Sequence, residues 1–161
     1  MGHAIQAIIV APGVPIPDPQ PSHLRTVPLP QGFTLLPLTG DLFDELRVLH
    51  PAEEREPCPA FWKFSASLRC FLVNLSRGGA VAYIETDYFG GVGEQAAASW
   101  RAGSPVFPPS KAEVGPINEA LRSIGAQVER ARDEFEALGL GAFEESRGAS
   151  CSRCASRLTS R

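Results

Sequence analysis

Hydrophobic and polar positions alternate most regularly between residues 80 and 101, where the chain reads AVAYIETDYFGGVGEQAAASWR. Successive side chains of a strand point to opposite faces, so this alternation predicts two strands, Ala80–Phe89 and Gln95–Arg101. The connection between them is rich in glycine, which permits the positive φ angles of a turn: Gly90, Gly91 and Gly93. The segment therefore predicts a β-hairpin at the centre of the protein.

Apolar residues recur at helical spacing in four other segments. Residues 60–76 predict a long amphipathic helix, because six apolar side chains fall within roughly one third of its circumference: Phe61, Phe64, Leu68, Phe71, Leu72 and Leu75. Residues 39–50 predict a shorter helix that a proline stops. Pro116 suits a first helical position and predicts a helix over 116–124. Residues 127–138 predict a last amphipathic segment.

Three further segments favour strands. Ala4–Ala11 is a β-branched run typical of a buried strand, and Phe33–Leu38 fits an edge strand. A short strand is expected around Pro105–Phe107. Residues 12–30 carry many prolines and predict an extended connection. Together with the hairpin, these elements predict one α+β domain over residues 1–145, with a small antiparallel sheet and helices packed on one face.

Composition agrees with a globular protein of 161 residues, 43% of them apolar and 20% charged. The net charge of −3 hides an asymmetry. Residues 1–145 hold 11 Lys/Arg against 18 Asp/Glu, a balance of −7, and residues 146–161 add four arginines and no acid. An acidic body repels nucleic acid and suits a basic partner protein. The basic tail has no core pattern, so we expect it to be disordered.

Sequence features also predict the location of the protein. No apolar stretch approaches the length of a membrane helix, and the first residues lack the basic region of a signal peptide. The four cysteines are too few and too irregular for a secreted disulfide framework. Cys151 and Cys154 form a CxxC pair, which we interpret as incidental because no second pair completes a zinc site. We expect a cytoplasmic protein with reduced thiols and no membrane partner.

The candidate functional residues lie on one face of the predicted hairpin. Two carboxylates, Glu85 and Asp87, stand between Tyr83 and Phe89, and Glu94 begins the opposite strand. We expect this face to be the more exposed one. Carboxylates among exposed aromatic side chains can anchor a basic protein surface. The predicted binding residues are Tyr83, Glu85, Asp87, Phe89, Gly90, Gly91, Gly93 and Glu94.

Other chemistry receives less support. Three neighbouring carboxylates can hold a metal or act as acid and base, since close like charges shift one another's pKa. No histidine or lysine lies near them in sequence, and no nucleophile, zinc-protease or nucleotide-binding motif is present. We therefore expect no cofactor, no metal and no catalytic residue. A small enzyme that uses Glu85, Asp87 and Glu94 remains the alternative, beside a structural or regulatory role.

A resemblance adds to this interpretation. The segments that carry it are AYIETDYFGGVGEQ from Ala82, then Trp100, Pro116-Ile117-Asn118 and Asp133-Glu134-Phe135. Over residues 4–141 they resemble small uncharacterised bacterial proteins, and their look is similar to immunity proteins that neutralise polymorphic toxins. The resemblance implies a protein-binding module whose partner is toxin-like.

Overall fold

The computed structural model describes residues 3–17, 20–53 and 58–143. In these residues the chain forms a six-stranded antiparallel sheet of order β2-β3-β1-β4-β5-β6. The strands are β1 His3–Val10, β2 Val27–Pro28, β3 Thr34–Pro37, β4 Val81–Phe89, β5 Val92–Arg101 and β6 Ser104–Ala112. Sheet and helices make a single α+β domain, which confirms the predicted class.

The helices are α1 Gly40–Leu49, α2 Ala66–Ser76, α3 Pro116–Ser123 and α4 Glu134–Ala137, with 3₁₀ turns at Pro30–Gly32 (η1) and Leu140–Phe143 (η2). α1 and α3 match their predicted positions. α2 is shorter than predicted because Ser65 caps it, its side chain accepting the N–H of Leu68 at 3.1 Å. The predicted helix over 127–138 is wrong except for its last turn, α4.

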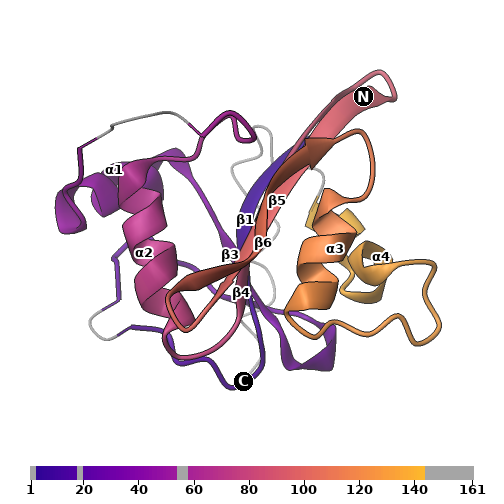
Figure 1. The fold of residues 1–161 in the computed structure, drawn as a ribbon, viewed down its shortest axis with the longest axis horizontal. Helices are drawn as coiled ribbons and strands as arrows, with labels where there is room; N and C mark the ends of the chain where they lie inside the picture. Colours follow the sequence, from indigo (N-terminus) through magenta and orange to yellow (C-terminus); the bar gives the residue numbers. More distant parts are fainter. Residues whose placement is uncertain (1–2, 18–19, 54–57, 144–161) are drawn as a thin grey trace, which may run out of the picture.

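Helices cover both faces of the sheet, not the one face that we expected (Figure 1). α1 and α2 pack on the face of Ile8 and Tyr83, and α3 packs on the face of Ile9 and Ile84. The reason is visible in β1, where four consecutive residues are buried: Ala7, Ile8, Ile9 and Val10. Since neighbouring strand residues point to opposite faces, such a run needs cover on both sides.

The predicted hairpin lies next to the centre of the sheet. β4 pairs with both β1 and β5, and β5 contributes three buried alanines, Ala96, Ala97 and Ala98. The turn is tighter than the sequence suggested, because Phe89 pairs with Val92 and only two residues connect the strands. Gly90 and Gly91 have φ angles of 62° and 82°. Two consecutive residues at positive φ form the turn that suits a two-residue hairpin.

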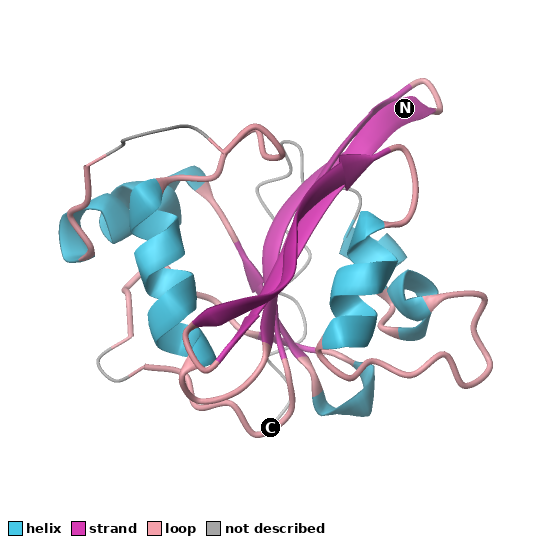
Figure 2. Cartoon of the chain, viewed as in Figure 1, coloured by secondary structure: helices cyan, strands magenta, loops and turns pink. Residues whose placement is uncertain are grey.

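One end of the hairpin extends past both helical layers, as Figure 2 shows. We call this the distal end of the sheet. Its position follows from the lengths of β4 and β5, nine and ten residues, which exceed what α2 and α3 cover. No helix in the described part of the chain is long and apolar enough to cross a membrane. The tail predicted to be disordered, 146–161, lies outside the described residues.

Candidate partner-binding surface

The predicted acidic and aromatic face divides into a buried half and an exposed half. Tyr83 and Glu85 are both 0% exposed, so the expectation that they lie on a free surface is wrong. A loop before α2 covers them, and its backbone N–H groups at Trp62 and Lys63 donate to the Glu85 carboxylate at 2.7 and 3.0 Å. The Tyr83 hydroxyl donates to the same carboxylate.

These donors satisfy the carboxylate of Glu85 inside the protein. Burial of a charged group is costly unless hydrogen bonds compensate it, and three donors do so here. Burial also raises the pKa of Tyr83 well above its ordinary value, and the charge of Glu85 and the hydrogen bond to it add to this rise. The hydroxyl therefore stays protonated and remains a donor. Glu85 consequently anchors a loop and is closed to a ligand.

The three predicted carboxylates do not converge. Glu85 lies beneath the loop, whereas Asp87 and Glu94 are exposed. Within the described ranges, no group of three or more His, Cys, Asp or Glu side chains is placed to hold a metal ion. The geometry thus gives no support to an acid–base pair or a metal centre built from Glu85, Asp87 and Glu94.

The exposed half of the face lies at the distal end. Phe89 and Val92 face each other across the turn and are 81% and 76% exposed. Asp87 lies directly opposite Glu94. Like charges in a cross-strand pair are destabilising. Lys111 of β6 compensates only Glu94, at 3.0 Å, and Asp87 has no ion-pair partner among the described residues.

The sequence interpretation missed two members of this surface. Trp62 is 41% exposed, and the Lys111 ammonium lies 4.7 Å from the centre of its ring, a cation–π contact. Both lie on the same side as Glu85, since Trp62 binds that carboxylate and Lys111 pairs with its neighbour Ala96. We define the distal surface as Trp62, Asp87, Phe89, Val92, Glu94 and Lys111. The only sequence signal for these two members is the aromatic pair Phe61-Trp62 close to Pro59.

The glycines of the predicted site have local structural roles. Gly90 and Gly91 form the turn. Gly93 lies opposite Tyr88, and a Cβ atom at Gly93 would come within 2.2 Å of the Asp87 carbonyl oxygen and 2.7 Å of the Tyr88 ring. Glycine at this position therefore lets an aromatic ring lie over the neighbouring strand. Phe89 and Val92 flank this turn and therefore lie at the distal end of the sheet.

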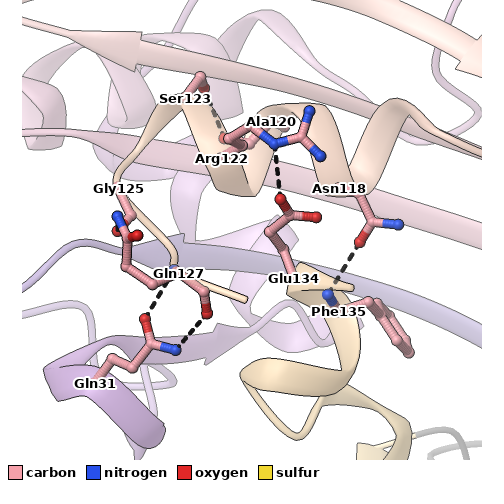
Figure 3. A network of polar contacts seen from close by, with 9 residues as sticks. All are labelled: Gln31, Asn118, Ala120, Arg122, Ser123, Gly125, Gln127, Glu134 and Phe135. Carbon is pink, nitrogen blue, oxygen red and sulfur yellow. Dashed lines mark hydrogen bonds and ion pairs between the residues drawn. The ribbon is translucent and has the colours of Figure 1, made fainter. Parts of the chain in front are cut away.

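On the face of the sheet that α3 covers, a different set of polar contacts joins the covering segments to one another (Figure 3). Asn118 of α3 accepts the N–H of Phe135 at 2.9 Å, and Arg122 binds the buried carboxylate of Glu134 at 2.7 Å. These two contacts attach α4 to α3. The side-chain amide of Gln31 pairs with the backbone N–H and C=O of Gln127 at 2.9 and 2.7 Å.

An open groove lies at the end of the sheet away from the distal surface. It encloses about 640 Å³, and its lining includes Gln31, Phe33, Arg101 and Glu129. Among the described residues that line it, one exposed cation and one exposed anion are the only charged side chains. Opposite charges in the same groove favour neither an anion nor a cation, so the groove defines no ligand class.

Comparison of the chain with protein-family models, with curated proteins and with solved structures finds no match. The structure itself defines the class: a single α+β domain with a six-stranded antiparallel sheet between two helical layers. The distal end carries the exposed apolar and charged side chains of the candidate surface.

Proposed function

We propose that this protein is a protein-binding module that engages a basic partner through the distal surface. The observation that carries the proposal is the placement of Phe89 and Val92, both more than three-quarters exposed, beside Asp87, which has no ion-pair partner in the described part of the chain. Exposed apolar side chains that lie together mark interaction sites more often than isolated ones do. The aromatic ring supplies area to bury, and the charges steer the encounter.

The negative charge of this protein favours a positively charged partner. The described body belongs to a stretch with 11 Lys/Arg against 18 Asp/Glu. Asp87 opposes Glu94 across the hairpin at a cost in stability, and a cationic partner would remove that cost on binding. The resemblance to immunity proteins favours a toxin as this partner and a cytoplasmic site of action. In this proposal, the module blocks the toxin by covering a basic surface of it.

A matched pair of double variants tests the proposal. Asp87→Lys with Phe89→Ser changes the distal surface, and Asp44→Lys with Val48→Ser makes the same changes on α1, where both side chains are also exposed. Each pair shifts the charge equally and removes one exposed apolar side chain. Proteins captured from the native host are compared for the two variants, and the association rate of any captured partner is measured at several salt concentrations.

The expected result is that the distal variant loses the partner, or associates about tenfold more slowly at low salt, while the α1 variant behaves as the unchanged protein. Co-expression with a toxin from the neighbouring gene should show protection lost only with the distal variant. Equal binding by both variants, at equal rates, would show that the distal surface is ordinary solvated surface.

A further inference from the structure

A small cavity lies on the other face of the hairpin, between β4–β5 and the helices α3 and α4. It encloses about 200 Å³, and its walls include Tyr88, Gln95, Ile117, Asn118, Asp133 and Phe135. Sites for drug-sized molecules usually enclose about 300–1,000 Å³. At about 30 Å³ for each water molecule, this cavity has the volume of roughly six or seven waters. It therefore suits a group the size of one side chain.

Some of the hydrogen-bond donors at the walls already have acceptors. Three backbone N–H groups have side-chain acceptors: that of Ile117 binds Gln95 at 2.9 Å, that of Phe135 binds Asn118 at 2.9 Å, and that of Glu136 binds Asp133 at 2.9 Å. Pro116, the first residue of α3, has no N–H. The start of a helix attracts anions through free N–H groups, and at the start of α3 the side-chain oxygen of Gln95 binds one of them, the N–H of Ile117.

The lining also includes an acceptor and two aromatic rings. Asp133 uses Oδ1 to cap α4, and its Oδ2 has no hydrogen-bond partner among the described residues. The rings of Tyr88 and Phe135 line the same space, and the described residues that line it include no lysine or arginine. Arg122 and Arg132 are paired with other acids at 2.7 and 3.3 Å.

We infer that this cavity binds an ammonium or guanidinium group at the end of a short alkyl chain. The carboxylate of Asp133 would pair with the charge, and the rings of Tyr88 and Phe135 would contact the cation and its alkyl stem. The occupant that we assign is a lysine or arginine side chain of the basic partner. The identity of this occupant rests on the proposed function, whereas the binding of a cation rests on the cavity alone.

The test is a ¹H–¹⁵N NMR titration of the full chain with four small probes. N-acetyl-lysine methylamide and N-acetyl-arginine methylamide carry the cation, N-acetyl-norleucine methylamide is a neutral match, and N-acetyl-glutamate methylamide is an anion. The two cationic probes should shift the amide signals of Asn118 and Phe135, and the other two should not. Equal shifts with the neutral probe, or a preference for the anion, would overturn the inference.

Two variants localise the binding. Asp133→Asn keeps an oxygen that can cap α4 but removes the charge, and it should weaken cation binding about tenfold, the loss expected for one charged hydrogen bond. Phe135→Leu should also weaken binding while it keeps an apolar side chain in place. The control is Asp44→Asn on α1, which should bind as the unchanged protein does. Undiminished binding by both cavity variants would refute the assignment.

Two further measurements distinguish a free amine from a side chain as the bound cation, and cation binding from partner binding. Tighter binding of free n-butylamine than of N-acetyl-lysine methylamide would indicate a small amine and refute the side-chain occupant. The double variant Asp87→Lys with Phe89→Ser lies on the opposite face and should leave the titration unchanged. Cation binding can thus fail while partner capture succeeds, or the reverse, so the two failures are distinguishable.

Discussion

Replacement of Glu85 by glutamine tests the loop anchor directly. The glutamine side chain has one oxygen and one NH₂ group, so one of the two backbone donors, at Trp62 or Lys63, loses its acceptor. An unpaired N–H that is partly buried costs about 1–3 kcal/mol, and the remaining bonds lose their charge assistance, about 1 kcal/mol more. We expect Glu85→Gln to lower the free energy of unfolding by about 2–4 kcal/mol.

Urea unfolding and thermal melting at neutral pH measure this loss. A loss of about 2–4 kcal/mol corresponds to a melting temperature lowered by roughly 4–16 °C for a domain of this size. Asp87→Asn is the matched control, because Asp87 lies two residues along the same strand face and is exposed. It should change stability by no more than about 0.5 kcal/mol.

Hydrogen exchange gives a local measure of the same anchor. The amides of Trp62 and Lys63 belong to a loop, and their protection depends on the hydrogen bonds to Glu85. In Glu85→Gln these two amides should exchange much faster, while those of the central strands keep their protection. The reasoning is refuted if Glu85→Gln melts like Asp87→Asn, or if both loop amides remain protected in the variant.

Four other changes have definite expected outcomes. Leu68→Ala should cost about 2–5 kcal/mol in urea unfolding because Leu68 is fully buried, whereas Cys70→Ser, on the exposed side of the same helix, should be nearly silent. Gly93→Ala should destabilise by about 1–3 kcal/mol, measured the same way, because its Cβ would meet backbone atoms. The backbone N–H of His23 is the main cause that lowers the pKa of Glu45 from 4.5 to about 2, so Glu45 stabilises the fold above about pH 4.5. This contribution should disappear as the pH falls toward 2. The melting temperature of Glu45→Gln should therefore fall less than that of the unchanged protein over the same pH range.

Much of the fold could be predicted from the sequence because local patterns determine it. The alternation in 80–101 predicted the hairpin, and the cap and stop signals of α1 and α3 gave those helices. The failures came from interactions between distant segments. The helical spacing of Phe61 and Phe64 continues into α2, yet both rings pack on Tyr83 from a loop, because Ser65 begins the helix. Spacing alone does not reveal where a helix starts.

The candidate site shows the same limit. Glu85 and Asp87 share a strand face and are equivalent in the alternating pattern, but a loop more than twenty residues earlier covers one and leaves the other exposed. Carboxylate burial of this kind follows from tertiary structure, since it requires donors that the strand itself does not supply. The alternating pattern places Glu85 and Asp87 on one face, and only the structure separates the buried residue from the exposed one.

The exposed residues of that face, at the distal end, do not favour the stability of the hairpin. A hairpin selected only for stability would place opposite charges, or a β-branched pair, at the positions of Asp87 and Glu94. It would also cover or replace an aromatic side chain as exposed as Phe89. Other parts of the described chain agree across levels, with capped helices, paired buried carboxylates and a two-residue turn of suitable glycines, although Val48 and Val114 are as exposed as Val92. A like-charge pair beside an exposed aromatic ring is typical of functional sites, since such sites keep residues that stability alone would remove. The distal surface is therefore the place where changes should alter binding while leaving the fold intact.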